Sequence, residues 1–449
     1  MGSKVKRELL KTPRGTRDLL ESELSVVRKI QKTAQEFSSY YGFQEIQTPH
    51  FEHAELFGAS LGESTDVVEK QTYTFRTRGG DALVLRPEGT VPAVRAYFEH
   101  GLGSWPQPVM LYYSGSFFRH ESPQKGRFRE FNQFGLEILG EELAVAEATI
   151  IRVCSLIFKE LGIETSLELN TLGDKECRPT WKKELVAFYR KHFEKLCKDC
   201  KRRFKENPLR LLDCKEPSCQ EFKAKAPQML EYVCEECKAH FKEVLEFMDS
   251  LELPYRLNPQ LVRGFDYYTR TVFEFVTTGK TEAEGETGGP ASPSASQGGK
   301  RVELGGGGRY DYLAQVLAGK DLAAAGAALG IDRIAELVSS RPEEKDRAQL
   351  LKTERPQVFL IQLGMAAKRK ILSLMEDFRK ARIPLAQSLS KDSLRGQLRL
   401  ASKLGVEFSL IMGQKEALEG TIIIRNMDSG MQETLPVAKA LERLKLKFK

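Results

Sequence analysis

The sequence predicts an α+β protein, in which a largely antiparallel sheet is interrupted by a helical insertion and followed by a smaller C-terminal α/β unit. Three observations support this prediction. Short apolar and aromatic runs of strand length lie on both sides of a block rich in Lys, Glu and Cys. That block carries apolar residues at helical spacing. Beyond it, residues 356–449 alternate strand-like and helix-like segments, which is typical of an α/β unit.

The first block, residues 1–174, is predicted to be the first part of the sheet domain. Residues 25–41 have apolar side chains at helical spacing, which favours an amphipathic helix. Residues 82–85, 109–113 and 134–138 are short apolar or aromatic runs, which favour strands. We therefore expect one long helix followed by a largely antiparallel sheet.

The second block, residues 175–250, is predicted to be a helical insertion. Six of the eight cysteines crowd into one part of it, between Cys197 and Cys237, whereas Cys154 and Cys177 stand apart. In a cytosolic chain such crowding favours metal binding or free thiols over disulfides. Cys197 with Cys200 and Cys234 with Cys237 form two C-x-x-C pairs, and together they are predicted to bind one structural zinc ion. Reduced cysteines that pack a small helical unit are the alternative.

The third block, residues 251–340, returns to the sheet. Strands are expected at residues 264–276 and 305–311, and an apolar helix is expected at residues 329–338. Residues 277–300 between the strands are rich in Gly, Glu, Ser and Pro, a composition that predicts a disordered surface loop.

The charged residues 341–355 are predicted to be a linker to the fourth block, residues 356–449. Asp428, Ser429 and Gly430 predict a hairpin turn near its end. The expected strands are residues 358–363, 408–412 and 421–425, and the expected helices are residues 368–381 and 393–403.

The composition is that of an ordinary globular protein. Hydrophobic residues make up 41% and charged residues 29% of 449, and no run approaches the roughly 18 apolar residues that span a bilayer. No signal-peptide core precedes Lys11, so we expect a cytoplasmic protein without membrane contact. The net charge of +7 fits a polyanionic partner and fits solubility alone equally well.

Three arginines stand in apolar or glycine-rich surroundings: Arg119, Arg263 and Arg333. Burying a guanidinium group there is costly unless an anion pairs with it. Each arginine taken singly fits a structural ion pair as well as a substrate site. Neither GxxxxGK[ST] nor GxGxxG occurs in the chain, so an ATP site here would be neither a P-loop nor a dinucleotide fold.

The strings around these arginines resemble the histidyl-tRNA synthetase family, which belongs to the class II aminoacyl-tRNA synthetases. They follow the family's order, the resemblance covers nearly the whole chain, and the last block is similar to the family's anticodon-binding domain. The strings are GFQEIQTP (42–49, first class II motif), RPEGT (86–90, amino-acid-binding strand end), FRHE and GRFREFNQ (118–121 and 126–133, second motif), LVRGFDYY and GGRYD (261–268 and 307–311, histidine-specific peptides) and GIDR (330–333, third motif).

The resemblance implies a homodimeric ligase that activates histidine with ATP and Mg²⁺ to an adenylate, releases diphosphate and loads the histidine onto the 3′ end of its tRNA. In the first step the histidine carboxylate attacks the α-phosphate of ATP. Both groups are anions, so fixed guanidinium charge lowers the barrier. The implied catalytic residues are Arg119, Arg263 and Arg333, and the implied ATP contacts are Arg119, Glu121, Arg127 and Arg333.

The resemblance also implies a histidine site. The α-ammonium group needs acceptors, and the imidazole needs one acceptor and one donor. Alternation along a strand is expected to put Tyr267 and Tyr268 on opposite faces, so that one faces the site and the other packs. The implied histidine contacts are Glu88, Gly89, Thr90, Gln133, Glu137, Tyr267, Tyr268 and Tyr310.

Three residues depart from the family's pattern: Ser122 where an arginine is frequent, Phe265 in place of leucine, and Tyr312 where glycine is common. Ser122 puts one phosphate or tRNA contact in doubt. Two rival functions stay open. One is a histidine-sensing regulatory subunit of ATP phosphoribosyltransferase built on the same fold. The other is a nucleic-acid-binding module without catalysis.

Overall fold

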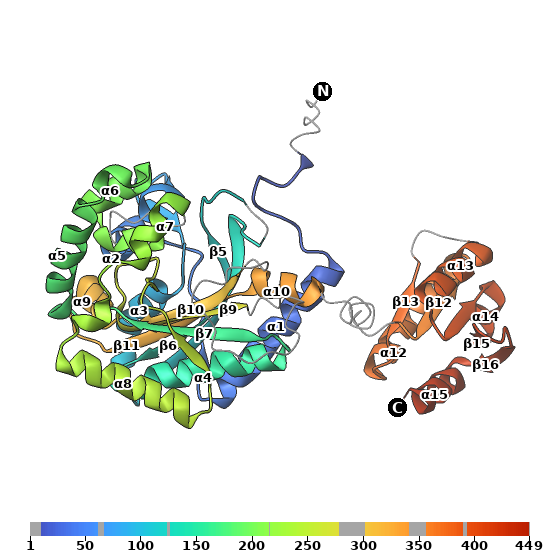
Figure 1. The fold of residues 1–449 in the computed structure, drawn as a ribbon. Coiled ribbons are helices and arrows are strands. Elements are labelled where there is room, and N and C mark those ends of the chain that lie inside the picture. The colour runs from blue at the N-terminus through green and yellow to red at the C-terminus, as the bar shows by residue number, and fades with distance from the viewer. Residues whose placement is uncertain are drawn as a thin grey trace, which may run out of the picture. The chain divides into compact units, whose positions relative to one another are not determined.

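The computed structural model describes residues 10–61, 67–123, 126–214, 216–277, 301–340, 356–388 and 393–448. The chain divides into two compact units, Met1–Lys345 and Asp346–Lys449 (Figure 1). The expected disordered loop, apart from Thr277 at its start, and the expected linker at 341–355 lie outside the described residues. Among the described residues, no helix has both the length and the apolar character that crossing a membrane requires.

An eight-stranded sheet forms the centre of the first unit, in the order β1-β5-β6-β11-β10-β9-β7-β8. The inner neighbours are antiparallel, whereas the edge pairs β1–β5 and β7–β8 are parallel. The largely antiparallel sheet predicted from the sequence is therefore confirmed. Its strands are β1 (Gln44–Glu45), β5 (Val109–Phe118), β6 (Glu130–Leu139), β7 (Thr165–Thr171), β8 (Tyr255–Leu257), β9 (Thr269–Thr277), β10 (Glu303–Arg309) and β11 (Ala324–Gly330).

The strand β11 was not anticipated from the sequence. It consists of Ala, Leu and Gly residues, and Ala and Gly are depleted in strands. The strand nevertheless pairs along its whole length with β6 and for five residues with β10. Hydrogen bonding on both sides therefore holds a segment whose own propensity is low. The expected helix at residues 329–338 begins two residues later, at Ile331.

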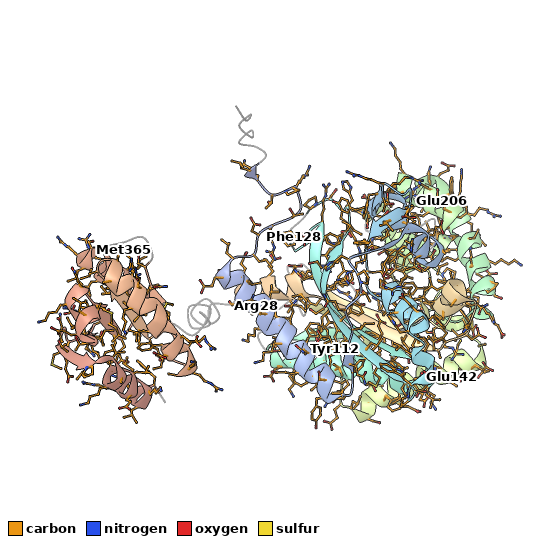
Figure 2. The ribbon with its side chains drawn as sticks, turned by 180° about the vertical axis from the view of Figure 1, so that it is seen from behind. Arg28, Tyr112, Phe128, Glu142, Glu206 and Met365 are labelled. Atoms are coloured by element: carbon orange, nitrogen blue, oxygen red, sulfur yellow. The ribbon has the colours of Figure 1, made fainter. Side chains whose placement is uncertain are left out.

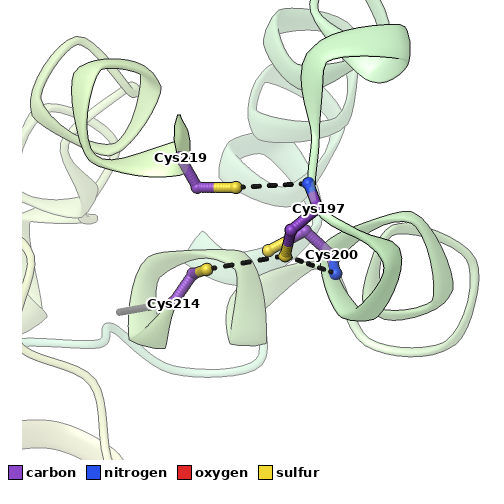
Figure 3. A group of neighbouring side chains, drawn as sticks. All are labelled: Cys197, Cys200, Cys214 and Cys219. Atoms are coloured by element: carbon purple, nitrogen blue, oxygen red, sulfur yellow. Dashed lines mark hydrogen bonds between the residues drawn. The ribbon is translucent and has the colours of Figure 1, made fainter. Parts of the chain in front are cut away.

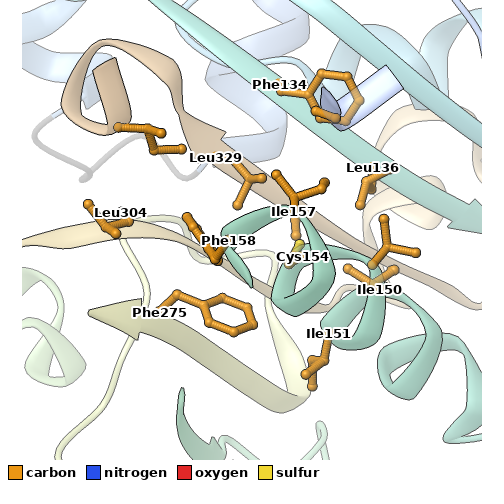
Figure 4. Close-up of a cluster of buried hydrophobic side chains, with 14 of the residues drawn as sticks. Phe134, Leu136, Ile150, Ile151, Cys154, Ile157, Phe158, Phe275, Leu304 and Leu329 are labelled. Carbon is orange, nitrogen blue, oxygen red and sulfur yellow. The ribbon is translucent and has the colours of Figure 1, made fainter. Parts of the chain in front are cut away.

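Four helices cover one face of this sheet, as Figure 1 shows. They are α1 (Glu21–Tyr40), α4 (Val145–Glu160), α8 (Glu235–Ser250) and α10 (Ile331–Ser340). Ile157 and Phe158 of α4 are fully buried against Phe275 and Leu304 of the sheet (Figure 4). Tyr112, labelled in Figure 2, stacks on Phe134 with ring centroids 5.5 Å apart. This apolar layer fixes the position of the strands.

A smaller sheet and three helices contribute, together with residues of the central sheet, to a second apolar cluster of this unit. The sheet has the order β2-β4-β3 and is antiparallel. The helix α3 begins at Thr90, the last residue of the RPEGT string, and packs against β6, which brings the string to the central sheet. The elements are β2 (Phe51–His53), β3 (Tyr73–Arg76), β4 (Ala82–Leu85), α2 (Ala54–Leu61), α3 (Thr90–Glu99) and α9 (Leu313–Ala318).

The insertion is helical, as predicted. Its helices are α5 (Cys177–Arg190), α6 (Lys198–Glu206), α7 (Pro217–Ala224) and then α8. Trp181, Leu185 and Tyr189 of α5 are buried in a core of its own, which also contains cysteines of the segment. The insertion therefore has a small core, separate from the layer under the central sheet.

The second unit is a five-stranded mixed sheet in the order β13-β12-β14-β15-β16, with β13, β12 and β14 parallel and the remaining pairs antiparallel. The predicted hairpin is confirmed, because β15 pairs with β16 across a turn in which Gly430 has φ 73°. The elements are β12 (Val358–Gln362), α12 (Met365–Lys380), β13 (Leu385–Gln387), α13 (Leu394–Leu404), β14 (Phe408–Met412), α14 (Gln414–Glu419), β15 (Thr421–Asn426), β16 (Gln432–Pro436) and α15 (Val437–Lys447).

Candidate active site

A cavity of about 510 Å³ lies in the first unit, and the three predicted arginines line it together. Arg119 reaches it from the end of β5, Arg263 from the segment before β9, and Arg333 from the first turn of α10. The sheet contributes Gln133 of β6 and Glu274 of β9 to the same wall. Residues that are far apart in the sequence therefore meet at one concave, charged surface.

Arg119 is held in place from several directions. Its Nε donates to the carbonyl oxygen of Pro87 at 2.8 Å. Its guanidinium carbon lies 5.2 Å from the ring centre of Phe131 and 5.5 Å from that of Phe265. Phe265, which departs from the family's leucine, thus contributes a cation–π contact. These contacts fix the orientation of a charged group whose burial lowers its pKa, against the raising effect of Glu121.

Arg263 and Arg333 share one carboxylate, that of Glu303. The Nη1 of Arg263 lies 2.9 Å from Glu274 Oε1 and 3.2 Å from Glu303 Oε1. The Nη1 of Arg333 donates to the Glu303 carbonyl oxygen at 2.7 Å and lies 3.4 Å from its carboxylate. Burial opposes ionisation of Glu303, but the charges of Arg263 and Arg333 lower its pKa. Burial and the neighbouring Glu303 charge raise the pKa of Glu274.

The start of α3 supplies acceptors on another part of the cavity wall. The carboxylate of Glu88 accepts from the backbone N–H of Thr90 at 2.7 Å and of Val91 at 2.8 Å, so it caps this helix. Nearby on the wall, the side-chain oxygen of Gln133 is buried and has no hydrogen-bond partner among the described residues. A buried acceptor without a partner is costly, which favours a bound donor at this position.

Glu137 lies behind the cavity wall, fully buried. It accepts from Thr90 Oγ1 at 2.8 Å, from the Tyr113 hydroxyl at 3.0 Å and from the Tyr310 hydroxyl. Burial raises its pKa to about 8, although these hydrogen bonds oppose the shift. Sequence reasoning missed Tyr113. Gly135 on the paired strand was the available signal, because a Cβ there would lie 2.1 Å from the Tyr113 ring.

The predicted alternation of Tyr267 and Tyr268 is wrong. Residues 261–268 form an irregular segment, and β9 begins only at Thr269. Both tyrosines line the cavity, with ring centroids 4.7 Å apart. Outside a strand, successive side chains are not forced to opposite faces. The expectation that Tyr310 serves the site directly also changes, since Tyr310 is buried and bonded to Glu137.

The loop of the second motif contributes two more of the predicted residues. Arg127 and Glu121 both line the cavity, and their side chains lie 3.5 Å apart. Asp332 was missed by sequence reasoning. Its carboxylate accepts from Arg17 at 2.9 Å and from the backbone N–H of Asn132 at 2.5 Å. Asp332 therefore ties the start of α10, and with it Arg333, to β6.

One residue of the GGRYD string, Arg309, has a structural role. Arg309 is fully buried and makes a two-point contact with Glu147 of α4, at 2.9 and 2.6 Å. The Nε2 of His240 on α8 lies 2.7 Å from the same carboxylate. Burial opposes ionisation of Glu147, yet hydrogen bonds from His240 and Arg309 lower its pKa to about 2. This network joins β10 to the helices α4 and α8.

The prediction of one zinc site made by both C-x-x-C pairs is wrong. Cys197 and Cys200 lie with Cys214 and Cys219 (Figure 3). Cys234 and Cys237 belong to a separate group with Cys177 and Asp174. The pairs are separated because each one begins a different helix, α6 or α8, at a different place on the insertion.

Comparisons with known proteins agree with this architecture. A family model described as histidyl-tRNA synthetase matches residues 15–334, and one described as an anticodon binding domain matches residues 357–447. Proteins named histidine–tRNA ligase from Dehalococcoides mccartyi and Natranaerobius thermophilus are 40% and 39% identical, each over 97% of this chain and 99% of its own length.

A solved structure gives the same result. The apo histidyl-tRNA synthetase from S. aureus aligns with a TM-score of 0.74 and 30% identity, over 97% of this chain and 100% of that chain. The rival function as a regulatory subunit is not favoured, because the relatives that match nearly the whole chain are named ligases. From the family match, the full-length relatives and the shared cavity of the three arginines, we conclude that the chain belongs to the histidyl-tRNA synthetase family.

Proposed function

We propose that the protein activates histidine with ATP to histidyl-adenylate and diphosphate, and then transfers the histidine to the 3′ end of its tRNA. The observation that carries this proposal is the convergence of Arg119, Arg263 and Arg333 on one cavity. The triphosphate of ATP and the attacking histidine carboxylate bring much negative charge into one site. Fixed guanidinium groups offset this charge better than mobile, water-exposed groups could.

The three arginines divide this task according to their positions. Arg119 has its Nε fixed on Pro87 and two rings on its faces, so it contacts the α-phosphate without needing to reorganise. Arg263 reaches the same phosphate from the side of β9, and Arg333 contacts the γ-phosphate. Arg127 and Glu121 belong to the ATP side of the cavity, where both line the wall.

Mg²⁺ accompanies ATP in this proposal, and the cavity offers suitable ligands. Glu274 and Glu303 both line the wall, and carboxylate oxygen is a preferred ligand of Mg²⁺. Bound with ATP, the ion would neutralise phosphate charge. The protein's own contribution is to hold these carboxylates beside Arg263, which keeps the site near charge balance.

The histidine substrate lies at the other end of the cavity. Glu88, Thr90 and Gln133 receive its α-ammonium group, beside the Gly89 backbone, and the Gln133 side-chain oxygen has no partner in the described part of the chain. The imidazole lies among further polar groups. An apolar analogue would leave these groups without hydrogen-bond partners, and such a site therefore rejects it. These groups are Tyr267 and Tyr268 on the wall and the buried network of Glu137 and Tyr310 behind it.

We further propose a cytoplasmic homodimer with four functional parts. Charging of tRNA serves protein synthesis, which supports the cytoplasmic location. Phe51 and Phe75, close to the first motif, are 52% and 43% exposed and in contact, and such an aromatic pair suits a subunit interface. The parts are residues 1–174 and 251–340 for catalysis, 175–250 for the insertion and 356–449 for the anticodon.

Residues 356–449 contact the tRNA anticodon in this proposal. The match to an anticodon binding domain supports it. Arg395 and Arg399 are exposed on one helix, α13, and are suited to phosphate contacts. Because phosphate contacts release counterions, tRNA binding should weaken steeply with salt, and replacing both arginines by Gln should reduce that slope by about two.

Exchange of labelled pyrophosphate into ATP tests the enzymatic proposal. Exchange that requires histidine, followed by attachment of labelled histidine to tRNA, is the expected result. Folded protein that binds tRNA but gives no histidine-dependent exchange would instead favour a nucleic-acid-binding module. Exchange with another amino acid would contradict the assigned substrate.

A further inference from the structure

Two groups of metal-ligand side chains lie at the insertion. In each group, one ligand atom per residue lies within 4.8 Å of all the others. Neither group contains a residue to which a catalytic role is assigned above. The first group is Cys197, Cys200, Cys214 and Cys219, and the second group is Asp174, Cys177, Cys234 and Cys237.

The distances within both groups suit a single tetrahedral ion. Four thiolates at about 2.3 Å from zinc are separated from each other by about 3.8 Å. In the first group the sulfurs of Cys197 and Cys214 are 3.9 Å apart (Figure 3). In the second group Asp174 Oδ2 lies 3.8 Å from the sulfur of Cys234 and 3.2 Å from that of Cys237.

Backbone N–H groups point at the sulfurs in the same way in both groups. In the first, the N–H of Cys200 donates to Cys197 Sγ at 3.4 Å, and the N–H of Cys197 donates to Cys219 Sγ at 3.4 Å. Such N–H donors stabilise thiolate over thiol, because the negative charge accepts the stronger hydrogen bond. Thiolate is the form that binds metal.

The second group repeats this arrangement. The N–H of Cys237 donates to Cys234 Sγ at 3.5 Å, and the N–H of Cys234 donates to Cys177 Sγ at 3.0 Å. The other oxygen of Asp174 accepts from the N–H of Glu176 and Cys177, at 2.9 and 3.0 Å. One carboxylate oxygen is thereby fixed by the backbone, and the other faces the sulfurs.

We propose that each group binds one structural zinc ion, so that the chain carries two. Sets of three or four thiolates select zinc over Mg²⁺ or Ca²⁺, and four protein ligands close the coordination shell against substrate. The insertion has a small core of its own, and small units of this kind gain much of their stability from a bound metal.

Both sites also hold the segment that carries Arg263. Beside the first group, Asn207 donates to both carboxylate oxygens of Asp266, at 2.9 and 3.0 Å, and Arg210 donates to the carbonyl oxygen of Gly264. Next to Cys177 in the second group, Arg178 donates to the carbonyl oxygen of Tyr268. The two zinc ions therefore order the cavity wall from the insertion side, where Cys197 and Cys214 of the first group line the cavity themselves.

Zinc counting on the full-length protein tests the proposal. Elemental analysis after dialysis should give two zinc ions per chain, and native mass spectrometry should give the same mass increment. Cys219→Ser and Cys237→Ser should each retain one zinc, and the double variant none. Cys154→Ala is the control, because Cys154 is buried in the apolar layer under the sheet, away from both groups, and should retain two (Figure 4).

Cobalt substitution provides a readout that does not depend on the variants folding. Wild-type protein reconstituted with Co²⁺ should bind two ions with the intense visible bands of tetrahedral thiolate coordination. Zinc removal should lower histidine-dependent exchange at least tenfold, with recovery on adding zinc. The two-site proposal would be overturned by a stoichiometry of zero or one, by iron in place of zinc, or by loss of both ions from Cys219→Ser alone. These outcomes do not depend on whether the protein charges tRNA.

Discussion

The substitution Gly326→Ala should weaken histidine binding selectively. A Cβ at Gly326 would lie 1.8 Å from Glu137 Oε2, whereas ordinary contact begins near 3.4 Å, so the carboxylate must retreat by about 1.6 Å. That displacement breaks its bonds with the Tyr310 and Tyr113 hydroxyls. A buried polar group left unpaired costs about 1–3 kcal/mol, so we expect the KM for histidine to rise about ten- to hundredfold.

Steady-state pyrophosphate exchange measures the effect, with histidine and ATP varied separately. The KM for ATP should change less than about twofold, since the cavity arginines do not contact Glu137. Gly58→Ala is the matched control, because Gly58 lies in a helix and no atom of the described residues comes within 4 Å of the added Cβ. An unchanged KM for histidine in Gly326→Ala would refute the role given to the Glu137 network.

Three further substitutions test separate parts of the structure. Arg119→Gln should lower kcat for pyrophosphate exchange about 10²–10³-fold, because it removes a preorganised charge at the transferring phosphate. Arg309→Gln should lower the free energy of unfolding in urea by about 3–5 kcal/mol, because it leaves Glu147 buried without its cation. Glu137→Gln should flatten the pH dependence of stability. The raised pKa of Glu137 adds stability below pH 4.5 that is lost as the pH rises through about 8.

Each of these predictions has a result that contradicts it. An unchanged kcat in Arg119→Gln would contradict its role at the transferring phosphate. Arg395→Gln, an exposed change in the second unit, is its control and should keep normal exchange, and an equal loss in Arg395→Gln would point to unfolding. A change below about 1 kcal/mol in Arg309→Gln would mean that the buried pair contributes little. For Glu137→Gln, urea unfolding at pH 5 and pH 8 that tracks the wild type would remove Glu137 as the titrating group.

Much of the candidate site could be predicted from short strings. Arg119, Arg263 and Arg333 stood out because a guanidinium in apolar, glycine-rich sequence needs an anion, and the resemblance of the surrounding strings to the family selected them; they share a cavity. Strands such as Ala82–Leu85 and Phe408–Met412 were placed correctly because their side chains are strongly apolar. The strand β11 was missed because alanine and glycine have little strand propensity, and its pairing depends on two distant neighbours.

The sequence by itself determined which residue types bear charge or bind metal, since those properties belong to single side chains and their near neighbours. Only the tertiary structure decided which of them meet. It separated the two C-x-x-C pairs, brought Asp174 to one of them, and placed Glu137 behind the cavity wall. Contacts between segments many residues apart depend on how helices and strands pack, and no local spacing records that packing.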